Sequence, residues 1–319
     1  MRLNQINASD GQTGDNPALR SLAIAAMTAA APILNYAEFY TMVGNADKVA
    51  KASTAKGGAV RAINDDFEAT NTTVAFADAT LTILGDMIAT DQALERRGYT
   101  VTSERARQLE EFCRAMGRFF TDQLVNGDGT SNALTGVKTL MPSGQILKYG
   151  GNNGATVLLG NSDTNKTTQQ AFIEALDELI SMVSGGATVL ICNDKVRARL
   201  QSVLREYVTV TTITDAMGQP MQLVSYNGIP LIDAGYKKDG TTKIITNTET
   251  LGTSSSVCSS LYAIRFGERI DLSIATTNGL NVKDLGLVGN KYNTSVEFDA
   301  GTLLQNDKAI AVMQGIKLA

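Results

Sequence analysis

The chain has 319 residues, of which 43% are hydrophobic, and it carries a formal net charge of −4. These values are typical of a globular protein with a sizeable core, and they fit neither a disordered chain nor a basic surface that wraps nucleic acid. Histidine is absent, which excludes the Ser/His and Cys/His nucleophile systems and removes the commonest metal ligand.

The cysteines and the apolar runs give no sign of a cofactor, a metal or a membrane segment. Cys113, Cys192 and Cys258 are far apart and match no metal-binding spacing, so we expect buried free thiols in a reducing compartment. The longest apolar run, residues 22–34, is too short to span a bilayer, and no basic cluster precedes it as in a signal peptide. We therefore expect no cofactor and no membrane anchor.

The N-terminal region is expected to be an extended arm. Residues 1–20 are polar and rich in turn formers, so they bury little without a neighbouring subunit. Residues 21–43 are expected to be partly helical, with an alanine-rich helix that ends before Pro32.

Residues 44–90 predict a long β-hairpin with a polar tip. Val74/Phe76 and Leu81/Ile83 alternate with small or polar residues, which is the periodicity of strands. An isolated two-stranded hairpin is only marginally stable in water, so we expect this one to lie on another subunit. The charged residues of this region that we expect at subunit contacts are Lys48, Lys51, Lys56, Arg61, Asp65, Asp66 and Glu68.

Residues 102–125 are expected to form a long amphipathic helix of about 35 Å. Its apolar residues recur at steps of three and four and form one stripe, at Ala106, Leu109, Phe112, Cys113, Met116, Phe119, Phe120 and Leu124. Thr102 is expected to cap the helix, Glu104 to favour its first turn and Glu110 to pair with Arg114. Asn126-Gly127 is expected to end the helix in a left-handed conformation.

Residues 168–207 are expected to form a helix–strand–helix unit on a sheet. Helical periodicity ends at Gly185-Gly186, the continuous apolar run 187–193 is typical of a buried central strand, and Asp194 is expected to cap the second helix. A Gly/Asn/Thr-rich loop with one short strand precedes this unit. Short strands are expected after it, at residues 208–214, 221–226, 229–234, 242–247 and 260–266, and again within 271–319.

Three motifs that suggest chemistry have simpler interpretations. The Gly-rich segment 150–154 precedes no helix and lacks Lys-Ser/Thr, so it is not a P-loop. Residues 126–132 lack the first Asp of a calcium-binding loop, and position 137 lacks its closing Glu, which favours a turn. The adjacent carboxylates Asp65/Asp66 and Glu110/Glu111 do not face each other, so we expect them to be solvated or salt-bridged.

Two further groups have open interpretations. Glu95, Arg96 and Arg97 form either a solvated surface or an inter-subunit salt-bridge site. Lysines near the hairpin and abundant asparagines leave room for a Lys–Asn isopeptide crosslink, which needs a buried geometry that a sequence does not specify.

The order of these parts resembles that of the major capsid proteins of tailed bacteriophages, which have the HK97-type fold. The segment NGDGTSNALTGV is similar to the family's pattern after its long helix, MGQPMQLVSYNGIPLIDA to its strand pair, and YNTSVEFDAGTLLQNDKAIAVMQGIKLA to its closing strands. The resemblance spans nearly the whole chain, and the order and spacing of the motifs are more specific than any motif alone.

The resemblance implies an α+β fold of four parts. They are an N-terminal arm (1–43), an extended hairpin or E-loop (44–90), a P-domain (91–167 and 271–319) with the spine helix 102–125, and an A-domain (168–270) with a central sheet and flanking helices.

The resemblance also implies a function and partners. The expected role is self-assembly into hexamers and pentamers of an icosahedral head shell, built in the host bacterial cytoplasm, that encloses double-stranded DNA in the virion without reading its sequence. A portal protein and decoration proteins are expected partners. Because the chain begins at Met1 with no room for a cleaved scaffolding segment, a separate scaffolding protein or none is expected. No catalytic residue is implied, so the chain is not expected to be an enzyme.

Two other functions stay open. An encapsulin-like bacterial compartment shell shares the fold, and a cargo enzyme encoded nearby would favour it, whereas a neighbouring portal or terminase gene would favour a phage. A His-free α/β enzyme that uses Asp, Lys and Tyr is the more distant alternative, and it would be a compact monomer with a ligand-binding cleft.

Overall fold

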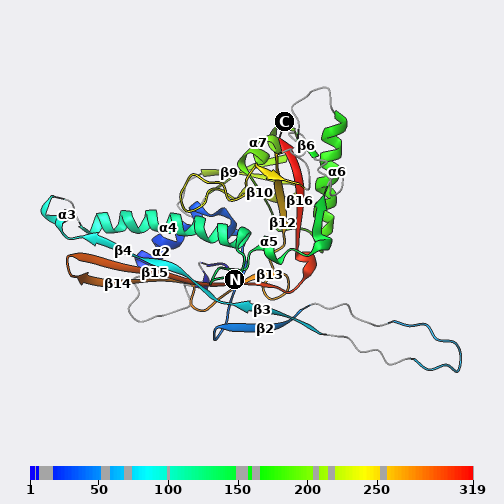
Figure 1. Cartoon of the computed structure of the whole chain (residues 1–319), viewed down its shortest axis with the longest axis horizontal. Helices are drawn as coiled ribbons and strands as arrows, with labels where there is room; N and C mark the ends of the chain where they lie inside the picture. Colours follow the sequence, from blue (N-terminus) through cyan, green and yellow to red (C-terminus); the bar gives the residue numbers. More distant parts are fainter. Residues whose placement is uncertain are drawn as a thin grey trace.

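A computed structural model describes residues 1–3, 5–6, 17–51, 58–67, 74–98, 101–148, 157–159, 166–203, 208–214, 220–251 and 257–318. The body is elongated, with one long helix lying along a sheet at one end and a second, upright sheet at the other (Figure 1). A hairpin projects from the base of the body. The chain therefore has an α+β architecture with a protruding strap.

The helices in the described residues vary widely in length. They are α2 (Pro17–Ala30), α3 (Ala93–Arg96), α4 (Val101–Asn126), α5 (Val137–Leu140), α6 (Lys166–Met182) and α7 (Asp194–Val203), with short 3₁₀ turns at Pro32–Asn35, Ser143–Gln145 and Asp307–Ala309. The alanine-rich helix α2 ends before Pro32, as predicted, because the residue before a proline disfavours the helical conformation.

Helix α4 confirms the predicted long helix to within one residue at each end. Glu104 lies in its first turn, and the Glu110 carboxylate pairs with the Arg114 guanidinium at 2.6 Å. The side chain of Thr102, the predicted cap, lies outside the described part of the chain. Helix α2 crosses α4 at Gly117, where a Cβ atom would lie 2.6 Å from the carbonyl oxygen of Met27. The crossing therefore requires glycine.

The predicted left-handed end of α4 is wrong. Neither Asn126 nor Gly127 has a positive φ, whereas Gly129 does, at +72°. The Gly127 amide still donates to the Gln123 carbonyl, and a Cβ atom on Gly127 would lie 2.0 Å from the carbonyl oxygen of Leu134. Glycine is needed here because the chain folds back closely on the helix end, not because the backbone is left-handed.

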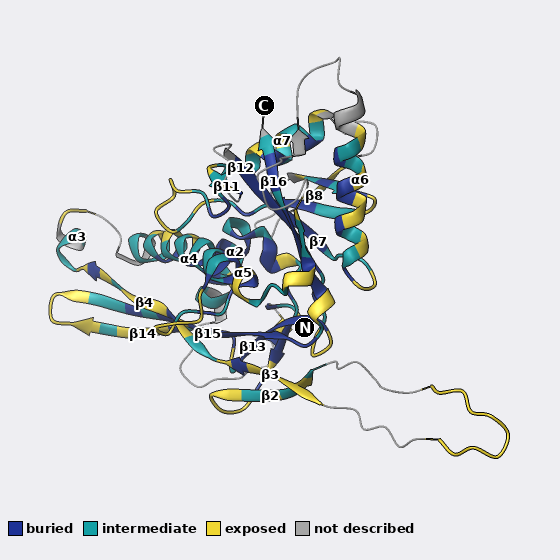
Figure 2. Cartoon of the chain, turned by 45° about the vertical axis from the view of Figure 1, so that its right-hand side comes forward, coloured by how far each residue is buried: buried dark blue, intermediate teal, exposed yellow. Residues whose placement is uncertain are grey.

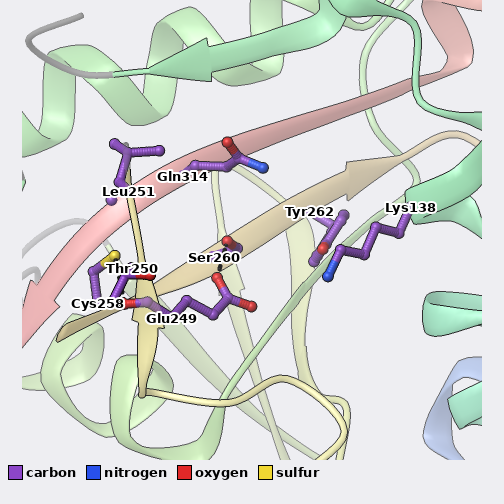
Figure 3. A pocket seen from close by; sticks show the side chains of 9 residues that line it. Lys138, Glu249, Thr250, Leu251, Cys258, Ser260, Tyr262 and Gln314 are labelled. Carbon is purple, nitrogen blue, oxygen red and sulfur yellow. Dashed lines mark hydrogen bonds between the residues drawn. The ribbon is translucent and has the colours of Figure 1, made fainter. Parts of the chain in front are cut away.

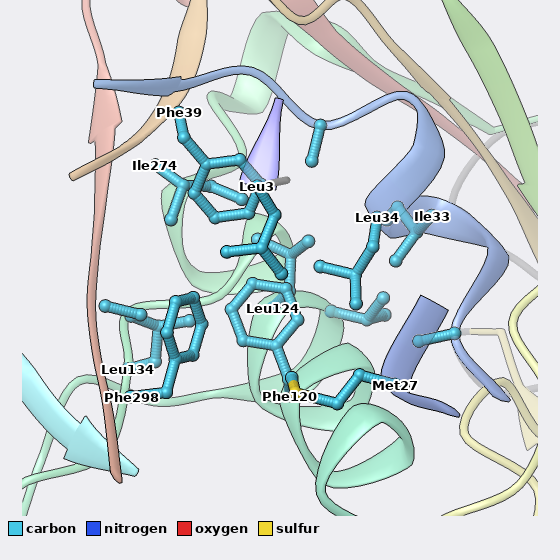
Figure 4. Close-up of a cluster of buried hydrophobic side chains, with 14 of the residues drawn as sticks. Leu3, Met27, Ile33, Leu34, Phe39, Phe120, Leu124, Leu134, Ile274 and Phe298 are labelled. Atoms are coloured by element: carbon cyan, nitrogen blue, oxygen red, sulfur yellow. The ribbon is translucent and has the colours of Figure 1, made fainter. Parts of the chain in front are cut away.

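A first sheet lies under α4 and is organised around the long strand β15 (Lys291–Leu304). Within the described residues, β15 pairs with β4 (Thr82–Asp91), β13 (Leu272–Thr276) and β14 (Leu280–Val288), and β13 also pairs with β1 (Phe39–Thr41). The main core lies between this sheet, α2 and α4, where the Phe298 ring packs edge-on against Phe39 and Phe120 at centroid distances of 6.2 and 5.5 Å (Figure 4).

The second sheet contains the remaining body strands in the order β5-β16-β12-β7-β10-β9-β8, with β6 pairing β16 and β11 pairing β12. The strands are β5 (Ile146–Lys148), β6 (Val157–Leu159), β7 (Val189–Cys192), β8 (Val208–Thr214), β9 (Pro220–Tyr226), β10 (Ile229–Asp233), β11 (Glu249–Thr250), β12 (Val257–Ile264) and β16 (Ile310–Leu318).

Strand β7 is the predicted buried central strand, and all four of its side chains are buried. Leu190 and Cys192 face the core under α6 and α7, whereas Val189 and Ile191 face the core shared with α4. Because successive side chains of a strand point to opposite faces, a strand between two cores is apolar throughout.

The paired part of the hairpin is shorter than predicted. Strands β2 (Ala46–Lys51) and β3 (Ala75–Thr80) pair with each other, but the residues of β4 that follow pair with β15 along ten positions. Leu84 of β4 enters the core, being 4% exposed. The long edge of β15 and this burial hold β4 in the body.

Two other regions differ from the sequence expectations. Strands β5, β6 and β16, expected with the P-domain, pair in the second sheet, because apolar residues of β16 lie beside β12. The predicted strand at residues 242–247 forms only an isolated bridge between Lys243 and Tyr236. Ile244 and Ile245 are both buried there, and consecutive buried side chains do not fit a strand with one solvated face.

Candidate inter-subunit surface

The hairpin tip, residues 58–67, has its own local structure although every residue in it is exposed. The Asp65 amide donates to the Ala62 carbonyl at 3.3 Å, and Asn64 between them has a φ of +71°, a conformation that asparagine tolerates. The Arg61 guanidinium donates to the Asp65 carbonyl at 3.0 Å and lies 5.4 Å from the centroid of the Phe67 ring. These contacts give the tip a defined shape.

The tip exposes large apolar side chains that are not among the contact residues predicted from the sequence. Val60 is 103% exposed, Ile63 91% and Phe67 63%. Figure 2 shows the described tip as exposed throughout and far from the body. In the sequence these three residues stand singly among polar and charged ones, a pattern that predicts only a polar tip. Because three large apolar side chains are held in water on one projecting loop, the tip is a candidate interaction site.

The root of the hairpin is fixed to the body by polar contacts. The Asp47 carboxylate pairs with the Arg269 guanidinium at 2.5 Å, Lys51 pairs with Asp307, and the Gln305 amide donates to the Ala50 carbonyl at 3.3 Å. We call these three contacts the root latch. Together with an apolar cluster in which Val49, Ala77 and Ala79 pack with Tyr40, Met42 and Leu303, they hold the root of the hairpin on the body.

The predicted contact residues lie at two distant places. Lys48 is exposed on β2, whereas Lys51 is engaged within its own chain by the root latch. Arg61, Asp65 and Asp66 lie in the exposed tip. Glu95, Arg96 and Arg97 lie at or beside α3, at the opposite end of the molecule (Figure 1), and Arg97 is exposed. Lys56 and Glu68, and the side chains of Glu95 and Arg96, lie outside the described residues. A role for these residues in subunit contacts stays a prediction.

A second exposed apolar surface lies on the strands that flank β15. Ile83 and Met87 of β4 are 74% and 54% exposed, and Leu285, Leu287 and Val288 of β14 are about half exposed. Arg105 of α4 holds β14 and β15 to the helix. It donates to the Asp284 carboxylate at 2.7 Å and to the Thr294 hydroxyl at 2.9 Å. The hydrogen bond from the Arg105 guanidinium lowers the pKa of the Asp284 carboxyl.

A cavity of about 220 Å³ opens between β4 and α4. Its α4 wall is apolar and consists of Phe112, Ala115, Met116 and Phe119, and its other lining residues are Gly85, Asp86 and Lys238. The Lys238 ammonium lies 5.4 Å from the centroid of the Phe119 ring. The cavity therefore combines an apolar wall with one acidic and one basic group, and we call it the spine pocket.

A second cavity, of about 280 Å³, lies beside β11, β12 and β16 (Figure 3). Ser260 donates to the Glu249 carboxylate, and the Cys258 thiol donates to the Glu249 carbonyl at 3.2 Å. The Lys138 side chain reaches the same cavity from α5. Burial raises the pKa of the Tyr262 hydroxyl further above its usual value.

The cysteines are buried and free, as expected. Burial raises the pKa of the Cys113 thiol to about 12 and raises the pKa of Cys192 and Cys258 as well. Among the residues that the structure describes, no three Cys, Asp or Glu side chains come together as a metal site. In the same residues, no helix has both the length and the apolar character required to cross a membrane.

Comparison with known proteins identifies the fold. No protein-family model and no curated protein matches the chain. Solved structures do match it along nearly its whole length. The holo-SrpI encapsulin complex from Synechococcus elongatus PCC 7942 has 14% identity and a TM-score of 0.55, and the match covers 99% of this chain and 96% of that one.

Viral and virus-like capsids match equally well. The capsid of a native GTA particle has 16% identity and a TM-score of 0.55, with 96% of this chain and 95% of that one covered. A structure from Mycobacterium phage Cain has 12% identity and a TM-score of 0.53, with 91% and 90% covered. The chain therefore has the HK97-type fold that these capsid and encapsulin chains share.

Proposed function

We propose that this protein is a shell-forming subunit, and specifically the major capsid protein of a tailed double-stranded DNA bacteriophage. The observation that carries the proposal is the projecting hairpin with a locally ordered and apolar tip. A monomer gains nothing from holding Val60, Ile63 and Phe67 in water. A neighbouring subunit would cover them, and repetition of the contact would build a closed shell.

The fold and the overall charge support the same role. The matching structures include both capsids and an encapsulin, all of which cover at least 90% of this chain. A net charge of −4 suits a wall that contains DNA without binding it tightly. The proposal gives no residue a catalytic role.

In this proposal the subunits form hexamers and pentamers of an icosahedral head in the virion, after assembly in the host cytoplasm. A portal protein, a separate scaffolding protein and decoration proteins are the proposed partners. The division into arm, E-loop, P-domain and A-domain is part of the same proposal, with β4 assigned to the P-domain sheet and β5, β6 and β16 to the A-domain sheet.

An encapsulin-like compartment is the second candidate, because the cyanobacterial encapsulin matches as well as the capsids do. The two candidates differ in what the particle encloses. A phage shell would enclose double-stranded DNA and be encoded beside portal or terminase genes, whereas a compartment would enclose a cargo protein.

Electron microscopy of the purified protein, alone and with products of neighbouring genes, tests both candidates. We expect rings or closed icosahedral shells, and nuclease-resistant DNA in particles recovered from infected or induced cells. Particles filled with one protein and free of DNA would favour the compartment. A monomer at all concentrations, with no ring or shell, would contradict both candidates.

A further inference from the structure

The cavity of about 280 Å³ beside β11, β12 and β16 is lined mainly by polar side chains and shares no residue with the spine pocket. Ser260 and Tyr262 of β12 line it and are only 2% and 4% exposed, whereas Lys138 of α5 is exposed. Gln314 of β16 adds an amide to the lining. The cavity therefore has buried polar groups in its wall and a solvated cation at its edge.

The Glu249 carboxylate in this cavity is held in a fixed position. Strand β11 pairs with β12 and places the Glu249 backbone opposite Cys258, whose thiol donates to the Glu249 carbonyl at 3.2 Å. The Ser260 hydroxyl donates to the carboxylate oxygen Oε2. Within the described residues the other carboxylate oxygen forms no hydrogen bond. Because the side chain is held at its backbone and at one oxygen, the second oxygen is a positioned acceptor.

Lys138 carries the opposite charge, yet it does not neutralise Glu249. In Figure 3 the Lys138 side chain extends past Tyr262 toward the Glu249 carboxylate. No ion pair joins these two residues in the described part of the chain, and the Tyr262 hydroxyl has no hydrogen-bond partner there. Buried polar groups in folded proteins normally have partners. An anion, a cation and a buried phenol hydroxyl are therefore all left to a molecule that occupies the space between them.

The charges and the volume of the cavity define the kind of molecule that fits. A singly charged ligand leaves either Glu249 or Lys138 without a partner, whereas a ligand with an ammonium and a carboxylate group satisfies both. A space of about 280 Å³ holds roughly nine water molecules at roughly 30 Å³ each. That volume suits one amino acid and is too small for a folded or extended peptide segment.

We propose that this cavity binds a small free amino acid, whose ammonium group donates to Glu249 and whose carboxylate accepts from Lys138 and the Tyr262 hydroxyl. The ligand would join α5 to the second sheet, because its two charged ends contact residues of both. This site goes beyond the proposed shell function and does not depend on it, since the cavity lies within one chain.

Saturation-transfer NMR of the full chain tests the site, since ligands this small bind with dissociation constants on the order of millimolar. The probes are glycine, β-alanine and γ-aminobutyrate, whose two charges are spaced differently, with propylamine and propionate as single-charge controls. We expect at least one dipolar probe to bind roughly fivefold or more tightly than both controls, because each control leaves one charged group unpaired. Absence of binding by all three dipolar probes, or equal binding by the controls, would overturn the proposal.

Two charge-neutral variants test the assigned contacts. Glu249→Gln should weaken binding of the dipolar probe roughly fivefold and leave propionate unaffected, whereas Lys138→Gln should weaken the dipolar probe and leave propylamine unaffected. Lys138 is exposed, so its variant should keep the wild-type unfolding midpoint. Lys283→Gln is the matched control, because Lys283 is exposed on β14 and does not line the cavity. Unchanged binding in either cavity variant would contradict the assignment, and so would equal weakening in the control.

Discussion

Neighbouring residues on one helix can have different roles, as Phe119 and Phe120 show. Phe120 is 0% exposed and packs against Phe298 in the main core. Phe119 is only partly buried, lines the spine pocket and lies under the Lys238 ammonium. The apolar stripe of α4 therefore has one edge in the main core and one edge that borders the spine pocket.

Truncation of these two rings should separate the roles. Phe120→Ala should lower the free energy of unfolding by about 3–5 kcal/mol, because it leaves a cavity in a dense core. Phe119→Ala should cost clearly less, since its ring already borders open space. Denaturant unfolding of the two variants measures the difference. An equal loss of stability would mean that Phe119 is a core residue as well.

Asp284 should make stability depend on pH. Its hydrogen bond from Arg105 lowers its folded pKa, so the stabilisation is present above the unfolded value of about 3.9 and is lost as the pH falls through the folded pKa. Asp284→Asn should therefore lower the free energy of unfolding by roughly 0.2–1 kcal/mol at pH 7. The difference from wild type should shrink below about pH 4. A difference that is the same at pH 3 and pH 7 would contradict this assignment.

At the scale of elements, the hairpin is a separate unit attached by its root. Its two strands pair only with each other through β2 and β3, and the root latch supplies two ion pairs to residues near β13 and β15. An isolated hairpin has little stability of its own. The latch therefore adds to the apolar contacts of β2 and β3 with Tyr40, Met42 and Leu303 in holding the hairpin on the body.

Removing the latch should loosen the hairpin and leave the body intact. In the Asp47→Asn, Asp307→Asn double variant, amide exchange in β2 and β3 should accelerate roughly fivefold, corresponding to about 1 kcal/mol for two exposed pairs. Exchange in β15 should not change. Asp78→Asn is the matched control, because Asp78 is an exposed acid of β3 outside the latch. Equal acceleration in the control would show a general effect of charge.

At the scale of the whole molecule, exposed apolar surface lies mainly at the ends. It is found on the hairpin tip and on the exposed faces of β4 and β14, whereas the body between them contains the cores. In the proposed shell, these exposed surfaces would be the contact surfaces of the subunit, far from its centre. Contacts at such distances link several neighbours without a larger core, and many modest contacts sum over a shell.

Deletion of residues 58–67 should therefore affect assembly and not folding. Every deleted residue is exposed, and changes at such sites usually alter stability by less than about 0.5 kcal/mol. Circular dichroism and the unfolding midpoint of the subunit should match wild type, while sedimentation should show no particles. Shells of normal size from the deletion variant would exclude the tip as a required contact.

Local periodicity in the sequence was sufficient for several elements. The spacing of apolar residues predicted α4 to within one residue, and the continuous run in residues 187–193 predicted the buried strand β7. Both predictions succeed because helix and strand periods are properties of contiguous residues. The charged residues of the hairpin tip are evident from residue type alone, whereas three separated apolar side chains among charges produce no period that would indicate an exposed apolar surface.

The long helix α4, the buried strand β7, the exclusion of histidine chemistry and, through the motifs, the resemblance to a capsid subunit could therefore all be inferred from the sequence alone. Only the tertiary structure decided that β4 pairs with β15, that Gly127 serves a close approach, and that Phe119 lines a pocket while Phe120 fills the core. The physical reason is that these outcomes depend on which distant segment lies opposite each residue. Residues 82–91 can form a strand with any suitable edge, and folding brings them to the long edge of β15 about 200 residues later in the chain.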